Sequence, residues 1–145
     1  VPDAGEAFDV RDYDFDRDPP RLTTMARIYD ATDPDLSGFR GRGGKLLLFH
    51  GWADPIVTPQ RTLEYYDAVR ARMGGNESMA EFARLFMLPG VDHCGLQPGP
   101  GAKSVDFDPL PALEAWVERN EAPTTLNVRW QMSDGSVRSR DVQAQ

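Results

Sequence analysis

Two mostly apolar runs of strand length stand out along the chain. The first runs from Leu46 to Phe49 and is bounded by glycines, and the second runs from Phe82 to Leu88 and ends at Pro89-Gly90. Continuous apolar runs of this length are typical of strands that are buried on both faces, as in a parallel sheet. We therefore expect two parallel strands that are covered by helices.

Helices are predicted before, between and after these strands. Thr58 and Asp108 each stand directly before a proline, which is the arrangement of an N-cap followed by Pro in the first helical turn. Apolar residues then recur at helical spacing behind both prolines. A third start of this kind lies at Asp33-Pro34. The expected helices cover residues 22–29, 34–40, 59–73 and a segment that begins at Pro109.

Three further segments of the chain show other patterns. Residues 126–132 and 137–140, joined through Ser133-Asp134-Gly135-Ser136, predict a β-hairpin. Residues 91–105 are rich in Gly and Pro and are expected to form a loop. Residues 1–20 predict an irregular N-terminal segment, in which the alternation of aspartates with Tyr13 and Phe15 favours a short extended stretch.

The order of these elements indicates the fold class. Strands that alternate with helices imply an α/β fold with a parallel sheet flanked by helices, here with a C-terminal β-hairpin. Two parallel strands are too few for a self-sufficient sheet. We therefore expect residues 21–145 to be the C-terminal part of a larger α/β domain, preceded by the irregular segment 1–20.

Two candidate catalytic residues follow the two predicted strands. Asp54 comes after the first strand and His93 after the second, and ligands of such sheets bind at the carboxyl ends of the strands. A carboxylate that accepts from a ring N–H orients a histidine and stabilises its charged form. His50 and Asp92 are the rival histidine and the rival acid. We expect His50 to be a buried structural hydrogen-bonding residue, and Asp92 to be poorly placed to orient its own neighbour.

The nucleophile is missing from this set. No Gly-x-Ser-x-Gly motif occurs, and none of the serines lies in a predicted strand-to-helix turn. A zinc site built from His50, Asp54, His93 and Cys94 is the other chemical option, but these residues lack the spacing of zinc ligands. The chain thus offers a base and its orienting acid, and no metal site is predicted.

The charge of the chain argues against some classes of binding partner. The net charge of −7 and the sequence pI of about 4.7 argue against nucleic acid and against anionic membranes. No apolar run reaches the length of a membrane span.

The chain starts at Val1 without an initiating Met or a signal peptide, so we expect a mature chain, an isolated domain or a proteolytic piece. Its single cysteine, Cys94, cannot form a disulfide within the chain.

At this point two motifs resemble a known family. His50-Gly51-Trp52-Ala53-Asp54 after the first strand, and Pro89-Gly90-Val91-Asp92-His93-Cys94 after the second, are similar to the acid and histidine segments of the tannase/feruloyl esterase family. Gly99-Pro100-Gly101 resembles the Gly/Pro-rich stretch that follows them. The resemblance runs over roughly residues 13–121 and implies the C-terminal portion of an α/β-hydrolase domain that carries a large lid.

The resemblance also implies a function. It implies a serine carboxylesterase acting on galloyl, feruloyl or related aryl esters, with Asp54 as the triad acid and His93 as the general base. It implies a disulfide from Cys94 to a cysteine beside the nucleophilic serine, both in an N-terminal part of the same protein that this chain lacks. The calcium of the family belongs to the lid, so no cofactor is expected here. Trp52 would line the aromatic pocket or pack against the protein.

The interpretation as an esterase extends to the cell compartment and to the activity of the chain alone. The implied disulfide favours an oxidising compartment, so the parent protein is expected to be periplasmic or secreted. The fragment alone is expected to be inactive. The alternative to an esterase fragment is a non-catalytic module of the same fold, whose exposed sheet edge would bind a partner or form a homo-oligomer. A third hypothesis is an enzyme that assembles from two separate chains.

Overall fold

The chain is described here by a computed structural model that covers residues 9–93 and 99–145. It forms two compact units, Val1–Asp33 and Pro34–Gln145. Cys94, for which a disulfide was predicted, lies outside the described residues. No helix in the described part of the chain is long and apolar enough to cross a membrane.

The N-terminal unit is made of short turns and one helix. Two 3-10 turns, Val10–Asp12 and Pro19–Leu22, lead into α1 (Thr23–Tyr29). The predicted extended stretch is wrong, because aspartate side chains capture nearby backbone N–H groups and hold turns instead. Asp14 Oδ1 accepts from the backbone N–H groups at 16 and 17, and the buried Asp18 carboxylate accepts from the N–H of Asp14 at 2.9 Å.

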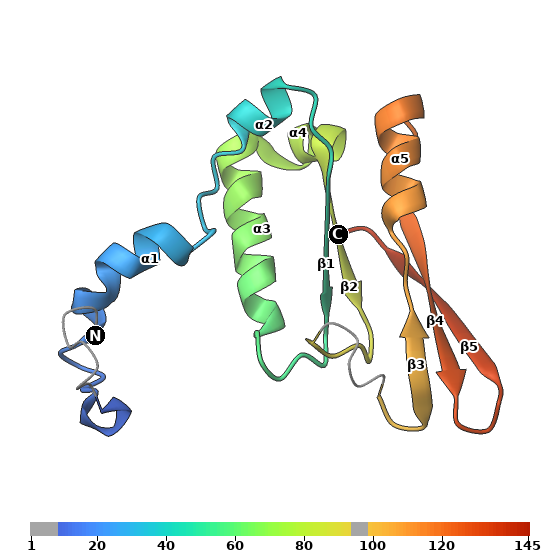
Figure 1. Cartoon of the computed structure of the whole chain (residues 1–145). Coiled ribbons are helices and arrows are strands. Elements are labelled where there is room, and N and C mark those ends of the chain that lie inside the picture. The colour runs from blue at the N-terminus through green and yellow to red at the C-terminus, as the bar shows by residue number, and fades with distance from the viewer. Residues whose placement is uncertain (1–8, 94–98) are drawn as a thin grey trace. The chain divides into compact units, whose positions relative to one another are not determined.

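The C-terminal unit contains the predicted parallel sheet. β1 (Leu46–Gly51) pairs in parallel with β2 (Ala83–Leu88), from Leu46 opposite Ala83 to Gly51 opposite Leu88. α3 (Pro59–Met73) and α4 (Gly75–Phe82) connect the two strands. Figure 1 shows the pair of strands with α3 running beside β1. Among the described residues, the other edge of β1 has no strand partner.

Two helices of this unit differ from the prediction. The helix expected to start at Pro34 begins later, as α2 (Ser37–Gly41), and its N-cap residue, Leu36, makes no side-chain capping bond. Directly before the helix, Asp35 Oδ1 accepts from the backbone N–H of Ser37 at 3.0 Å and holds a local turn. α4 was not predicted. It begins at Gly75 directly after Gly74, and the positive φ angles of these two glycines turn the chain sharply after α3.

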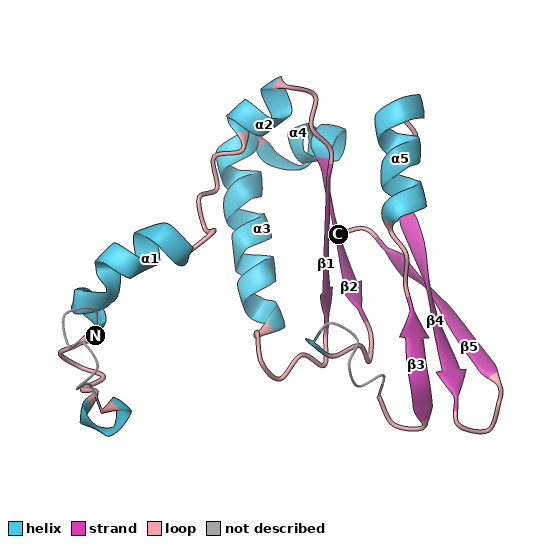
Figure 2. Cartoon of the chain, in the orientation of Figure 1, coloured by secondary structure: helices cyan, strands magenta, loops and turns pink. Residues whose placement is uncertain are grey.

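The C-terminal residues form a second, antiparallel sheet. Its strand order is β3 (Ala102–Asp106), β4 (Thr125–Met132) and β5 (Val137–Gln143), and α5 (Leu110–Arg119) connects β3 with β4 (Figure 2). β4 and β5 are the predicted hairpin, whereas β3 lies where a loop was expected. β3 carries no apolar run that would have predicted it, and its strand conformation comes from pairing with β4.

The core lies on both faces of β2. Leu85 and Met87 pack with residues of α3 and α4 on one face, including Tyr66 and Phe82. Phe86 and Leu88 pack on the opposite face with residues of β4 and β5. This alternation explains why β2 is apolar at nearly every position.

Candidate functional site

A close contact between two backbones brings the two predicted loops together. β1 ends at Gly51, and a Cβ atom at this position would lie 2.0 Å from the carbonyl oxygen of Val91, so a side chain has no room there. The N–H of Ala53 donates to the same carbonyl at 3.0 Å, and the N–H of Trp52 donates to the carbonyl of Leu88 at 2.9 Å. The loops after β1 and β2 are therefore held side by side by their own peptide groups.

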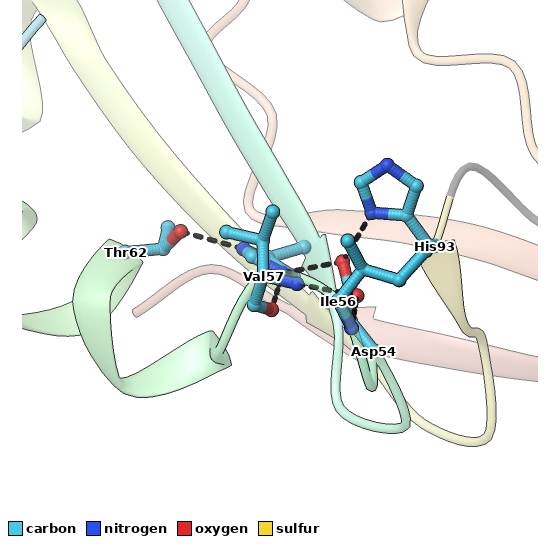
Figure 3. A network of polar contacts seen from close by, with 6 residues as sticks. Asp54, Ile56, Val57, Thr62 and His93 are labelled. Atoms are coloured by element: carbon cyan, nitrogen blue, oxygen red, sulfur yellow. Dashed lines mark hydrogen bonds and ion pairs between the residues drawn. The ribbon is translucent and has the colours of Figure 1, made fainter. Parts of the chain in front are cut away.

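Asp54 is fixed in this loop by its own side chain. Its Oδ1 accepts from the backbone N–H groups of Ile56 and Val57 at 2.8 and 2.9 Å. Its Oδ2 is thereby turned toward two histidine rings, with His93 Nδ1 at 2.8 Å and His50 Nε2 at 3.1 Å. Figure 3 shows this network. The Asp54 side chain is buried, with 5% of its surface exposed.

The ionisation of Asp54 follows from these contacts. Burial raises the pKa of the carboxyl, but the N–H groups of Val57 and Ile56, together with His93 and His50, outweigh it and hold the pKa well below its usual range. Asp54 is therefore an anion at neutral pH. An anion can only accept, so the His93 Nδ1 that faces it carries the ring proton.

The remaining nitrogen of His93, Nε2, does not face Asp54. With the proton on Nδ1, the neutral ring has a free lone pair on Nε2. Figure 3 shows this nitrogen turned away from Asp54. The side chain is one-third exposed and lines a cavity of about 370 Å³. A free lone pair on a ring that lines an open cavity and is held by a buried carboxylate can act as a general base.

His50 occupies the position expected of a structural hydrogen-bonding residue and also contacts the acid. Its Nε2 faces two acceptors at 3.1 Å, Asp54 Oδ2 and the carbonyl oxygen of Val57. Nε2 therefore carries the proton and donates. Its Nδ1 lies 2.5 Å from the hydroxyl of Thr62 in the first turn of α3, and in the neutral ring it accepts from that hydroxyl.

The cavity around His93 is mostly apolar. Its walls include Phe49 from β1, Val105 from β3 and Phe107 beyond β3. The rings of Phe49 and Phe107 meet edge to face, with their centroids 5.1 Å apart. A planar apolar group fits such a wall, because aromatic rings prefer edge or offset contacts with one another.

Asp92 also lines this cavity, beside His93. Its Oδ1 is buried and has no hydrogen-bond partner among the described residues. The His93 ring is hydrogen-bonded to Asp54 Oδ2 through Nδ1, so the acid that orients His93 in this structure is Asp54 and not its sequence neighbour.

The other predicted site residues lie apart from the cavity or outside the described part. Trp52 is about half exposed and is not among the residues that line the cavity, so its contact with substrate stays a prediction. None of the serines, all of which the structure describes, lines the cavity. Within residues 9–93 and 99–145, no group of three or more His, Cys, Asp or Glu is arranged to hold a metal ion.

The sequence-based reasoning missed the apolar wall and Thr62. Phe107 and Val105 reach the cavity through β3, which was expected to be a loop. Thr62 carried a usable signal, since it lies one turn into a helix that starts directly after the loop that follows β1.

Comparison with known proteins decides the family. The model of the family described as "Tannase and feruloyl esterase" matches residues 3–144. The chain belongs to the tannase and feruloyl esterase family. It is 40% identical over 131 residues to a mono(2-hydroxyethyl) terephthalate hydrolase of Piscinibacter sakaiensis, a match that covers 85% of this chain and 20% of the relative. It is 38% identical over 131 residues to a probable feruloyl esterase of Arthroderma benhamiae, covering 83% of this chain and 24% of the relative.

Solved structures of this family confirm the α/β fold. An esterase from Aspergillus oryzae matches with a TM-score of 0.69 at 27% identity, over 94% of this chain and 29% of that structure. The 145 residues thus span about a fifth to a quarter of the length of the relatives described above. Both the family and the fold class that the sequence predicted are confirmed, and the family is one of carboxylic-ester hydrolases.

Proposed function

We propose that this chain supplies the acid and the base of a serine esterase that hydrolyses esters of aromatic acids. Asp54 is the acid, His93 is the general base, and the serine comes from an N-terminal part of the same, longer protein. The observation that supports this most directly is the 2.8 Å contact between Asp54 Oδ2 and His93 Nδ1, which leaves Nε2 without this partner on a ring that lines the cavity.

The reaction follows from this geometry. His93 Nε2 takes the hydroxyl proton as the serine oxygen attacks the ester carbonyl carbon, and the buried anion of Asp54 stabilises the resulting imidazolium. The imidazolium then gives its Nε2 proton to the oxygen of the departing alcohol, and the acyl group stays on the serine. Water attacks this acyl-enzyme with His93 again as the base, which releases the acid and restores the serine.

Two observations support an aromatic acyl group. Phe49, Val105 and Phe107 give the cavity beside His93 an apolar wall that contains two aromatic rings. The relatives at 38% and 40% identity are described as acting on feruloyl and terephthalate esters, both of which are aromatic. Trp52, half exposed in the loop before Asp54, would approach the substrate from outside this wall.

Cys94 and the cell compartment belong to the same proposal. Cys94 directly follows the base in sequence. A disulfide from it to a cysteine next to the serine would fix the nucleophile close to His93, and it would require an oxidising compartment, periplasmic or extracellular. Mass spectrometry of the longer protein without reductant tests this: a peptide that contains free Cys94 would contradict the disulfide.

The test of the function compares a matched pair of esters. Methyl benzoate and methyl cyclohexanecarboxylate differ only in the aromaticity of the acid, and methyl ferulate and methyl gallate extend the series. We expect the longer protein to hydrolyse the aromatic esters faster, and we expect the 145-residue chain alone to be inactive. Failure of the longer protein to hydrolyse any of these esters would refute the proposal. Hydrolysis by the chain alone would refute an external nucleophile.

A further inference from the structure

His50 and His93 share one carboxylate oxygen. His93 Nδ1 donates to Asp54 Oδ2 at 2.8 Å, and His50 Nε2 donates to the same oxygen at 3.1 Å. Oδ1 of this carboxylate is already occupied by the two N–H groups of Ile56 and Val57. The acid therefore receives four hydrogen bonds, and only one of them comes from the proposed base.

We propose that His50 is a positioning residue for the general base: by donating to Asp54 Oδ2 it disperses part of the negative charge of this carboxylate and so weakens the hold of Asp54 on the His93 ring. The inference deepens the proposed function, on which it rests for the role of His93. A donor that shares an anionic acceptor disperses part of its negative charge and so weakens its stabilisation of a neighbouring cation.

The donor is held in place from both sides of its ring. The Thr62 hydroxyl lies 2.5 Å from His50 Nδ1 and satisfies it, which leaves the ring proton on Nε2. The carbonyl of Val57, 3.1 Å away, can only accept from Nε2 and so favours the same tautomer. The His50 side chain is 11% exposed, so water competes little for these groups.

Few other charges face the base. Among the described residues that line the cavity, the titratable ones are His50, Asp54, Asp92 and His93 itself, while the walls from β3 and the segment after it contribute Val105 and Phe107, which carry no charge. Asp92 is an acidic neighbour that acts on His93 whether or not His50 is present. Variants at position 50 leave Asp92 unchanged, so its effect cancels when they are compared.

Gln and Met provide a matched pair of substitutions. The side-chain amide of Gln reaches the position of an imidazole Nε2 and keeps a donor for Asp54, while Met has the same length and no donor. The chain has only two histidines. A sample labelled with ¹⁵N-histidine therefore shows two ring systems in wild type and a single one, that of His93, in each variant. The measurement is the pH midpoint at which the His93 ring gains its second proton.

We expect His50→Met to raise this midpoint by roughly half to one pH unit, and His50→Gln to stay within about 0.3 unit of wild type. Equal midpoints for wild type and His50→Met, or equal shifts for Met and Gln, would overturn the inference. If His50→Met does not fold, the tautomer of His50 in the wild-type spectrum tests the inference instead. An Nε2–H tautomer for His50 supports the inference, and an Nδ1–H tautomer refutes it.

These measurements need no ester, so they separate the two proposals. If the longer protein lacks esterase activity, the proposed function is refuted, but the proposal that His50 shares Asp54 with His93 is not. If the longer protein is an active esterase and His50→Met leaves the acid limb of its pH–rate profile unchanged, the proposal for His50 is refuted, but the proposed function is not.

Discussion

Gly51 and Val91 touch so closely that only glycine fits at the end of β1. A Cβ atom at Gly51 would lie 2.0 Å from the Val91 carbonyl oxygen and 2.6 Å from its carbonyl carbon. Both of these atoms belong to the backbone and cannot rotate away. The contact joins the loop of Asp54 to the loop of His93, so the distance between acid and base depends on a residue that carries no chemistry.

Gly51→Ala is therefore expected to be strongly destabilising. Separating the two backbones costs at least the roughly 1–3 kcal/mol of an overpacked site, and it pulls Asp54 away from His93. Urea unfolding of the chain measures the loss. Gly41→Ala is the control, since a Cβ atom there meets nothing within 4 Å and no positive φ is required. A Gly51→Ala variant as stable as Gly41→Ala would contradict the contact.

Trp116 ties α5 to the strands through two cations. It is 1% exposed, and Lys45 Nζ and the Arg84 guanidinium lie over its ring at 5.4 and 5.0 Å from the centroid. Trp116→Ala removes a large buried side chain and both contacts, so we expect a loss of about 3–5 kcal/mol in the free energy of unfolding. Val117→Ala, at the exposed next position of α5, should change it by less than about 0.5 kcal/mol. Equal losses for the two variants would show that α5 is not docked through Trp116.

Asp54 links stability to acid pH. The pKa of its carboxyl is held below the usual range in the folded state, so its stabilising contribution is complete above the unfolded pKa of about 4 and is lost as the pH falls further. The difference in unfolding free energy between wild type and Asp54→Asn should thus shrink steadily from pH 5 toward pH 2. Asp35, whose pKa is lowered to about 2, is unchanged in both proteins and cancels. A difference that stays constant over this range would contradict an ionised, hydrogen-bonded Asp54.

Phe107 is expected to favour aromatic acyl groups. In the longer protein, Phe107→Ala opens the wall beside His93 and should lower kcat/KM for methyl benzoate by about tenfold, with a smaller effect on methyl cyclohexanecarboxylate. Phe15→Ala is the control, because this ring is 83% exposed in the N-terminal unit. The same loss for both esters would place Phe107 in the packing of the protein and not in substrate selection.

The sequence predicted the elements whose signals are local. β1 and β2 were visible as apolar runs; both faces of β2 are buried, whereas β1 is only partly buried and its Phe49 is about half exposed. α3 was visible because a proline marks its start. The neighbouring positions of Asp54 and His93 followed from the rule that parallel strands end at one edge of a sheet. The structure places the two side chains in contact, as that rule requires.

The missed features depend on partners far away in the sequence. β3 is a strand only because β4 pairs with it, and its own residues show no pattern. The contact of His50 with Asp54 requires the loop after β1 to fold back toward the end of that strand, and no residue type in the loop predicts this. The late start of α2 accompanies the local turn in which Asp35 accepts from the N–H of Ser37, and the residue types alone do not predict that turn.

The reaction of a serine-directed fluorophosphonate with the longer protein tests the central claim most directly, because it reports whether His93 activates a nucleophile from outside this chain. The account predicts rapid labelling of one serine upstream of residue 1, slowed at least about 100-fold by His93→Gln and by Asp54→Asn, and unchanged in Phe15→Ala, whose ring is exposed in the N-terminal unit. Labelling at the wild-type rate in His93→Gln would contradict it.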